Sequence, residues 1–283
     1  MAKPPGTTSV RDELRLLGLQ PKHGLGQNFL ADPVHLQRIV EAAGLDPSDV
    51  VLEIGPGLGA LTELLARLAG RVVSVELDGR LITYLRARFA ARSHVTIVQG
   101  DILKLAPGEL LASVCSGGRG YKVVANLPYY ITAAVLRHLV EAETPPSSMV
   151  LTVQSEVADR MVATPPHMSL LALGVQFFCV GEIADRIPAG AFYPVPKVDS
   201  AVVKLVRRTD YAVPGISPAS FFRVARAGFC QPRKQLRNSL AAGLGVPTSQ
   251  AQALLEMAGI SAQRRAETLS LDEWGALVSA VEA

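Results

Sequence analysis

Four consecutive residues combine side chains that could hold a nucleobase: Asn126, Leu127, Pro128 and Tyr129 follow the apolar run YKVVA. Asn and Pro are common in turns, so a turn is the simplest interpretation. A second interpretation is a pocket that grips a flat, polar substrate. The Asn126 side-chain oxygen and the Leu127 or Pro128 carbonyl could accept the two N–H groups of an exocyclic amine. Tyr129 could then stack on the base that carries this amine.

An exocyclic amine on a base is a weak nucleophile because its lone pair is delocalised into the ring. Two hydrogen-bond acceptors would favour a pyramidal nitrogen and direct its lone pair toward an electrophile, and such positioning contributes strongly to catalysis. Pro128 would keep the neighbouring carbonyls rigid. This chemistry needs no histidine or cysteine nucleophile, so the stretch predicts group transfer to an amine.

A glycine-rich loop, EIGPGLGA, follows an apolar run and could bind the co-substrate. Glycines allow a sharp turn and a close approach of the backbone to a ligand. Gly55, Gly57 and Ala60 fit the dinucleotide pattern G-x-G-x-x-G/A, and the acidic Glu76 follows Gly55 by 21 positions. Taken alone, the loop is therefore compatible with a nicotinamide dinucleotide.

Three carboxylates favour S-adenosylmethionine over the dinucleotide. Glu53 stands just before the loop, where it would repel a pyrophosphate and attract a ligand with ammonium and sulfonium charges. Glu76 could accept from both ribose hydroxyls, and Asp101 in GDIL could accept from the adenine amine. The dinucleotide interpretation also lacks an identifiable acid or base for hydride transfer.

The elements that must position these residues alternate between strands and helices, which is typical of a parallel sheet flanked by helices. We expect strands over 49–55, 71–77, 95–101, 121–126, 149–154 and 200–206. The candidate residues follow the carboxyl ends of these strands, where open α/β sheets bind ligands. Asp32-Pro33 predicts the start of a helix over 32–43. The apolar segment 170–180 could also close the sheet.

The C-terminal part has a different pattern. Residues 209–218 carry Gly, Pro and Ser and read as a linker, and helical patterns follow near 219–229, 233–243, 248–258 and 271–281. We expect an α/β domain over 1–208, whose residues 1–48 form an N-terminal helical extension. A small all-helical domain is expected over 209–283.

Composition bounds the class of protein. The chain has 283 residues, 49% of them apolar, which is typical of a globular protein. Its net charge of +3 permits nucleic-acid binding without requiring it. The three cysteines form no CxxC pair, which argues against a disulfide framework or a metal site and fits a reducing cytoplasm. No apolar run is long enough to span a bilayer, so we expect no membrane partner.

The order of the motifs resembles the KsgA/RsmA family of small-subunit (16S) ribosomal RNA adenine N6,N6-dimethyltransferases. The matching segments, which run nearly end to end, are GQNFL, LEIGPGLGALTELL, VVSVELD, GDIL, NLPYYIT, FYPVPKVDSAVV, QPRKQLRNSL and RAETLS. The resemblance implies a Rossmann-like S-adenosylmethionine-dependent methyltransferase sheet. It also implies dimethylation of two adjacent adenosines near the 3′ end of small-subunit rRNA, in a late assembly intermediate.

The resemblance assigns roles to individual residues. It implies cofactor contacts for Asn28, Leu30, Gly55, Glu76, Asp101 and Asn126, with Gly57 in the same loop, and it assigns the target amine and base to Asn126, Leu127, Pro128 and Tyr129. It also implies that Phe192 closes on the target base opposite Tyr129. Without the resemblance, a core position for Phe192 is the better interpretation.

A basic run extends from Phe221 to Leu240 and contains no acidic residue. On charge alone it is a solvated helix face. Given the resemblance, we expect Arg233, Lys234 and Arg237 to lie on a helix and to meet RNA phosphates, in contacts that depend on salt and not on sequence. Base choice would then come from RNA shape and from a flipped-out adenine.

The chain departs from the family pattern at Ser155, where lysine is usual, and at His167-Met168, where Tyr-Gly is usual. These departures concern local RNA contacts. Two alternatives remain open: a methyltransferase acting on large-subunit rRNA, and an RNA-binding assembly factor without catalytic activity. Intact Glu76, Asp101 and Asn126 argue against the second. Nothing in the sequence indicates an obligate dimer, so we expect a monomer.

Overall fold

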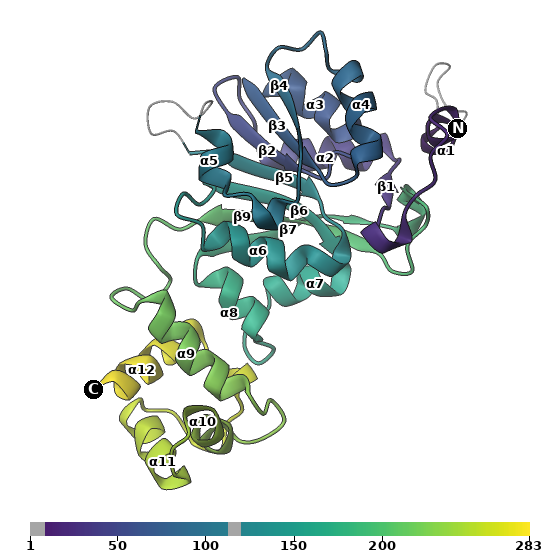
Figure 1. Cartoon of the computed structure of the whole chain (residues 1–283). Helices are drawn as coiled ribbons and strands as arrows, with labels where there is room; N and C mark the ends of the chain where they lie inside the picture. The colour runs from purple at the N-terminus through teal and green to yellow at the C-terminus, as the bar shows by residue number, and fades with distance from the viewer. Residues whose placement is uncertain (1–8, 113–119) are drawn as a thin grey trace. The chain divides into compact units, whose positions relative to one another are not determined.

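The computed structural model describes residues 9–112 and 120–283, and the chain divides into two compact units (Figure 1). The first unit contains the chain up to Ala158 together with Glu182–Leu205. The second contains Asp159–Gly181 and Val206–Ala283. This division differs from the expected single boundary near residue 208, because the segment 159–181 belongs with the C-terminal helices.

A seven-stranded sheet runs through the first unit in the order β4-β3-β2-β5-β6-β9-β7. Its strands are β2 (Val50–Ile54), β3 (Arg71–Glu76), β4 (Val95–Gln99), β5 (Lys122–Asn126), β6 (Ser148–Gln154), β7 (Cys179–Ile187) and β9 (Ser200–Arg207). The pairings among β2, β3, β4, β5 and β6 are all parallel. The sequence prediction of a Rossmann-like sheet is confirmed.

The register of the parallel strands brings their carboxyl ends to one edge. Ile54 at the end of β2 pairs with Val75 on one side and Ala125 on the other. Glu76 at the end of β3 pairs with Gln99 at the end of β4. The residues that follow these strands therefore emerge beside one another, although they lie far apart in the sequence.

Helices cover both faces of this sheet. Those of the first unit are α1 (Val10–Leu16), α2 (Pro33–Ala43), α3 (Ala60–Leu68), α4 (Gly79–Arg88), α5 (Pro107–Leu111), α6 (Thr132–Val140) and the start of α7 (Ser155–Met161). In Figure 1, α2, α3 and α4 lie on one side of the sheet and α6 on the other. The expected start of α2 is confirmed, since the Asp32 side chain accepts from the Val34 N–H at 2.8 Å.

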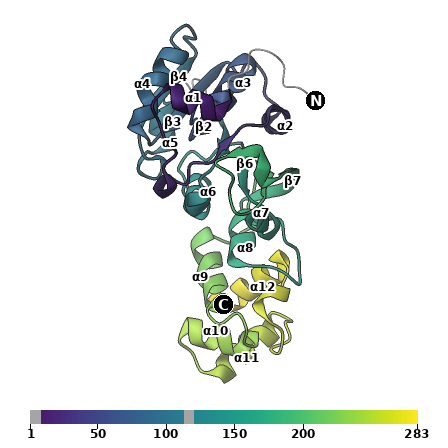
Figure 2. The same ribbon diagram turned by 90° about the vertical axis from the view of Figure 1, so that its right-hand side faces the viewer.

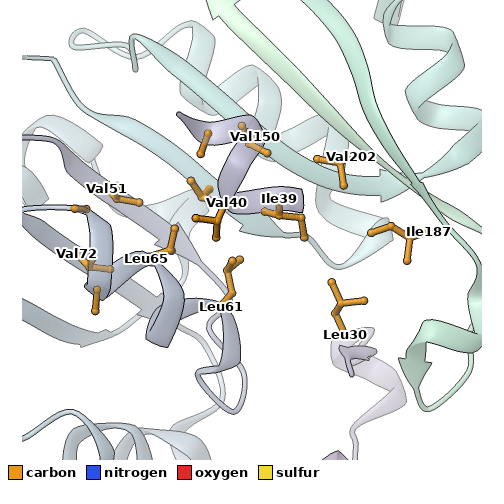
Figure 3. Packing of buried hydrophobic residues seen from close by; sticks show 14 of the residues in the cluster. Leu30, Ile39, Val40, Val51, Leu61, Leu65, Val72, Val150, Ile187 and Val202 are labelled. Atoms are coloured by element: carbon orange, nitrogen blue, oxygen red, sulfur yellow. The ribbon is translucent and has the colours of Figure 1, made fainter. Parts of the chain in front are cut away.

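The core of the first unit lies between α2, α3 and the sheet (Figure 3). Ile39 and Leu65 on the two helices are fully buried, as are Val51 and Val72 on β2 and β3. Because β2 is buried along its whole length, its residues other than Glu53 are all apolar and do not alternate with polar ones.

A short antiparallel pair lies beside this core. Strand β1 (Phe29–Leu30) pairs with β8 (Phe192–Tyr193), and Leu30 lies opposite Phe192. Both of these residues pack into the core cluster. The pair ties the N-terminal segment to a part of the chain that is more than 150 residues away in sequence.

The second unit is helical and is drawn in teal to yellow in Figures 1 and 2. It contains α8 (Leu170–Gln176), α9 (Pro218–Phe229), α10 (Leu236–Leu244), α11 (Thr248–Met257) and α12 (Leu271–Glu282). The four helices expected after residue 218 are therefore confirmed. The start of α10 is an exception, because this helix begins at Leu236 and not near residue 233.

The segment 170–180 was expected to close the sheet, and this expectation is wrong for its first part. Residues 170–176 form α8, whose N-cap Ser169 accepts from the Ala172 N–H at 3.1 Å. The ring of Phe177, just after α8, lies among four other aromatic rings at centroid distances of 4.4–5.4 Å, those of Phe178, Tyr211, Phe221 and Phe222. This cluster explains why 159–181 packs with the C-terminal helices.

No helix in the described parts of the chain is both long enough and apolar enough to cross a membrane. Cys179 is buried and Cys230 is exposed, and both are free thiols. Cys115 lies outside the described residues.

Two helical glycines of the second unit offer a matched test of its packing. A methyl group at Gly243 in α10 would lie 2.6 Å from both Cβ and the carbonyl oxygen of Ala227 in α9, whereas Gly174 in α8 has open space. Gly243→Ala should therefore lower the free energy of unfolding by about 1–3 kcal/mol. Gly174→Ala should raise it by about 0.5–1 kcal/mol, because alanine favours the helix. Urea unfolding of the two variants checks this, and equal effects would contradict the helix contact.

Candidate functional site

One cavity opens at the edge of the sheet where the parallel strands end. It is lined by ten of the residues selected from the sequence: Asn28, Leu30, Gly55, Gly57, Glu76, Asp101, Asn126, Leu127, Pro128 and Tyr129. These residues come from five separate stretches of the chain, and the strand register brings them together. Among the described residues that line the cavity, the charged ones are Glu13, Glu76 and Asp101, so its charge is acidic.

The glycine loop is hydrogen-bonded to the carboxylate of Glu76. Gly55 and Gly57 have φ values of 72° and 58°, which favour glycine over other residues. The Gly57 N–H donates to Glu76 Oε2 at 3.1 Å, and the Asp78 N–H donates to Glu76 Oε1 at 2.8 Å. Glu76 is only 6% exposed, and its desolvation raises its pKa. Each oxygen keeps a second lone pair for a ligand hydroxyl.

Glu53 does not contribute to the cavity, and the electrostatic argument built on it is wrong. Its side chain points into the interior, where Oε2 accepts from Thr62 Oγ1 at 2.7 Å and from Ser74 Oγ at 2.6 Å. It is 1% exposed, and burial raises its pKa to about 7. A buried carboxyl that does not line the cavity cannot contact a cationic ligand there. The acidic character of the cavity comes mainly from Glu76 and Asp101, because Glu13 is paired with Arg88 at 2.8 Å.

Asp101 caps a short helix and also lines the cavity. Its Oδ1 accepts from the Leu103 N–H at 3.1 Å and caps a short 3₁₀ helix, Ile102–Lys104. The same residue lines the cavity, and about a third of its side chain is exposed. The cap fixes the carboxylate at the end of β4 and leaves it open to a ligand.

The Asn126 amide is oriented by the N-terminal segment. Its Nδ2 donates to the main-chain carbonyl of Asn28 at 3.1 Å. The Asn28 side chain donates in turn to the Gly26 carbonyl at 3.2 Å. Because the donor end of Asn126 is engaged, its Oδ1 faces away from Asn28 as an acceptor.

The three residues after Asn126 are fixed by local contacts. The Leu127 N–H donates to the Thr152 carbonyl at 3.2 Å, and the Pro128 carbonyl accepts from the Ile131 N–H at 3.2 Å. The Tyr129 hydroxyl lies 2.8 Å from Ser200 Oγ, and desolvation raises the pKa of this phenol. Ser200 belongs to the motif FYPVPKVDS, so two distant motifs meet at Tyr129. Sequence reasoning missed this role of Ser200.

The segment that carries Asn28 is clamped at a second point, which the sequence did not reveal. Gln27 Nε2 donates to Asp78 Oδ2 at 3.0 Å, and Lys22 Nζ lies 3.5 Å from Asp78 Oδ1. Arg80 also binds Asp78, and this contact contributes most to lowering the pKa of Asp78. Asp78 is recognisable from sequence as the N-cap of α4, but its partners 51 and 56 residues away are not.

Phe192 is not at the cavity, which corrects the position expected opposite Tyr129. Its ring is 3% exposed and packs in the core cluster with Leu30, Val202 and Ile187. The antiparallel pairing of β1 with β8 turns Phe192 inward, opposite Leu30. The simpler interpretation of Phe192 as a core residue is therefore the one the structure supports.

The three basic residues assigned to RNA do not share one helix face. Arg233 and Lys234 are exposed in the turn before α10, and only Arg237 lies on the helix. Arg237 is half-buried, and its Nε is buried without a hydrogen-bond partner among the described residues. The Leu236 N–H at the start of α10 donates to the Arg264 carbonyl at 2.7 Å, so the neighbouring loop occupies this helix end.

The departures from the family pattern fall in different environments. Met168 is buried, and its N–H donates to the Glu267 carbonyl at 2.9 Å, so this position packs inside the second unit. His167 is exposed. The Ser155 N–H donates to the Asp199 carbonyl at 3.0 Å at the start of α7.

Comparisons with known proteins agree on one family. The ribosomal RNA adenine dimethylase family matches residues 18–282. The chain is 50% identical over 256 residues to ribosomal RNA small subunit methyltransferase A of Dehalococcoides mccartyi, covering 90% of this chain and 87% of that one. It is 42% identical to the protein of the same name from Moorella thermoacetica, covering 93% of each chain.

Two solved structures resemble most of the chain. A dimethyladenosine transferase from Plasmodium falciparum is similar with a TM-score of 0.75 and 26% identity, covering 88% of this chain and 95% of that one. The 23S rRNA methyltransferase ErmE is similar with a TM-score of 0.71 and 28% identity, covering 90% of this chain and 100% of that one.

Glu53 generates a pH-dependent prediction. The pKa of Glu53 is about 7 in the folded state, against an ordinary value of 4.5. Between pH 4.5 and pH 7, Glu53 is therefore protonated in the folded protein but ionised in the unfolded one. Its contribution to stability is therefore present below pH 4.5 and is lost as the pH rises through about 7, by about 3 kcal/mol in total. Glu53→Gln cannot titrate, so its stability relative to the wild type should rise by about 2.5 kcal/mol between pH 5 and pH 8.

Urea unfolding of both proteins at the two pH values measures this difference, and groups common to both cancel. Glu41→Gln removes an exposed carboxyl from α2 and serves as the control, for which we expect a small difference at both pH values. A stability difference for Glu53→Gln that does not change with pH would contradict the raised pKa.

Proposed function

The chain belongs to the ribosomal RNA adenine dimethylase family, and from this premise we propose that it transfers methyl groups from S-adenosylmethionine to the N6 amines of two adjacent adenosines near the 3′ end of small-subunit rRNA. The products are dimethyladenosines. Identities of 42–50% to small-subunit methyltransferases, against 28% to the large-subunit enzyme ErmE, support the small subunit as the substrate. We place the reaction on a late assembly intermediate in the cytoplasm, with the chain acting as a monomer.

The cavity fits S-adenosylmethionine. Its acidic lining suits a ligand with ammonium and sulfonium charges, and the positive φ values of Gly55 and Gly57 allow the backbone to approach closely. Glu76 would accept from the ribose hydroxyls and Asp101 from the adenine amine. Asn28 and Leu30 would close the opposite side. When bound, this cofactor supplies an electrophilic methyl group on a sulfonium.

The observation that carries the proposal is the orientation of the Asn126 amide. Its Nδ2 is engaged by the Asn28 carbonyl, so Oδ1 is the atom available to the substrate. We infer that Oδ1 accepts a hydrogen bond from one N–H of the target amine. We favour the Leu127 carbonyl as the second acceptor, because one of the two lone pairs of the Pro128 carbonyl is already engaged by the Ile131 N–H. This choice narrows the two possibilities that the sequence left open.

These two acceptors explain how an amine with a delocalised lone pair can react. Holding both N–H groups favours a pyramidal nitrogen and directs its lone pair toward the methyl carbon. In the transfer, a carbon–nitrogen bond forms, the carbon–sulfur bond breaks, and the nitrogen releases one proton. After the first transfer one N–H remains for one acceptor. The dimethylated amine donates to neither, which favours release of the product.

The target base would stack on Tyr129. Its ring is half-buried, and its hydroxyl is fixed by Ser200, so the ring needs little reordering when a base arrives. Phosphate contacts would come from Arg233 and Lys234, which are exposed. Arg237, with its buried Nε, would support the local fold of α10 more than it would bind RNA. Base selection would rest on the pocket and on RNA shape.

Substitution of Asn126 distinguishes a methyltransferase from a non-catalytic assembly factor, because only the methyltransferase has an activity that requires this amide. Asn126→Ala should lower kcat for methyl transfer by at least about 100-fold, because one acceptor of the amine is lost. The dissociation constant for S-adenosylhomocysteine should change by less than about 3-fold, since Glu76 and Asp101 remain. Labelled methyl transfer to under-methylated small subunits and calorimetric titration measure the two quantities.

Asn238→Ala, a change of an exposed asparagine in α10, controls for the loss of an amide. Undiminished dimethylation by Asn126→Ala would contradict the proposed mechanism. Mapping of the labelled bases in the wild-type reaction also decides between the small and the large subunit.

Phosphate contacts predict a change in salt dependence. Arg233→Glu and Lys234→Glu should each weaken binding to the small subunit and reduce the slope of log affinity against log salt by about 1. Arg86→Glu makes the same charge change at an exposed position on α4 and should leave the slope nearly unchanged. Filter binding between 50 and 200 mM salt, roughly the range over which such contacts respond, measures the slopes. If the wild type and the three variants all have the same slope, Arg233 and Lys234 do not contact phosphates and are only part of a solvated surface.

A further inference from the structure

Two adjacent tyrosines at the cavity have different environments. Tyr129 is half-buried and bonded to Ser200, whereas Tyr130 is 61% exposed. Both lie on the short 3₁₀ turn Tyr129–Ile131, directly after β5. A tyrosine packed in the core would be buried, so Tyr130 has another role or none.

Tyr130 nevertheless has a fixed place at the edge of the cavity. It lines the same cavity as Asn126 and Asp101. Its ring lies against the backbone of Gly26, where a methyl group would be 3.3 Å from Cδ1 and Cε1 of Tyr130 and equally close to Pro128 Cβ. The ring therefore rests on a backbone surface that a larger residue would disturb.

The support for this ring is itself anchored. Gly26 has a φ of 60° and lies next to Gln27, whose side chain binds the buried carboxylate of Asp78. Gly26 also accepts, through its carbonyl, from the Asn28 side chain. The exposed ring of Tyr130 thus sits on a segment that is held on both sides, and little conformational entropy is lost if a flat ligand covers it.

We propose that Tyr130 is a positioning residue that stacks on a nucleobase next to the target adenosine. This assignment rests on the proposed function. When a base leaves its stack, the neighbouring base loses a stacking partner, and an exposed aromatic ring can replace it. Because the proposed target has two adjacent adenosines, the neighbour is a purine, which offers a large surface for stacking.

The occupant of the ring is a base and not the cofactor, because the groups suited to the ribose and adenine lie on other strands. Glu76 and Asp101 follow β3 and β4, whereas Tyr130 follows β5 together with the residues assigned to the target amine. Stacking of this kind tolerates different bases and adds affinity for single-stranded RNA. Loss of Tyr130 should therefore affect the binding of the ribosomal substrate and not that of the cofactor.

The test compares Tyr130→Ala, Tyr130→Leu and Tyr130→Phe in methyl transfer to under-methylated small subunits. The Ala and Leu variants should raise KM for the subunit by about 5- to 100-fold and change kcat little, because stacking acts on binding. Tyr130→Phe keeps the ring and should stay within about 2-fold of the wild type. The dissociation constant for S-adenosylhomocysteine should be unchanged in all three.

A matched control removes exposed apolar surface elsewhere. Val34 on α2 is 55% exposed, and Val34→Ala should leave both KM and kcat unchanged. Wild-type KM for Tyr130→Leu would overturn the stacking assignment, as would a parallel loss of S-adenosylhomocysteine affinity, which would place the ring over the cofactor. Failure of the wild-type protein to methylate the subunit would instead overturn the proposed function, and the assignment with it.

Discussion

The hydrogen bond from the Asn126 side chain to the Asn28 carbonyl is the contact on which the pocket depends. An asparagine amide can present either a donor or an acceptor, and only a partner fixed in space decides which one faces the substrate. Here the partner is main chain from a segment almost 100 residues earlier. That segment is held by the β1–β8 pairing at one end and by Gln27 with Asp78 at the other. The orientation of the Asn126 amide therefore depends on several distant contacts in the first unit.

Two glutamates on neighbouring strands show how burial divides their roles. Glu53 on β2 points into the core, is bonded to two hydroxyls, and has its pKa raised to about 7. Glu76 on β3 faces the cavity, and two main-chain N–H groups stabilise its carboxylate. From the sequence, Glu53 was expected to attract a cationic ligand and Glu76 to accept from ribose hydroxyls. Glu53 pairs in register with Ser74, two residues before Glu76, so both glutamates point to the same face of the sheet. Glu76 lies farther along, at the carboxyl end of β3, and this position lets a ligand reach it.

Much of the first unit could be predicted because its signals are local. The buried parallel strands read as apolar runs, Asp32 caps α2, and the ligand residues follow strand ends that a parallel sheet brings together. The errors lie where distant contacts override local pattern. The β1–β8 pairing turns Phe192 inward, and the aromatic cluster around Phe177 draws the segment 159–181 into the second unit. The helical periodicity around Arg233 extended beyond the actual start of α10.

The charge of the cavity also bears on how RNA can enter it. The charged residues among its described lining are all acidic, whereas Arg233 and Lys234 are exposed in the other unit. A phosphate would be repelled from this lining, and a neutral base would not. In the proposed reaction, this acidic lining would therefore disfavour entry of the RNA backbone more than entry of an extruded base. Under this proposal, electrostatics favours a flipped adenosine, because the reactive amine would approach the methyl donor while its phosphates stay outside the acidic lining.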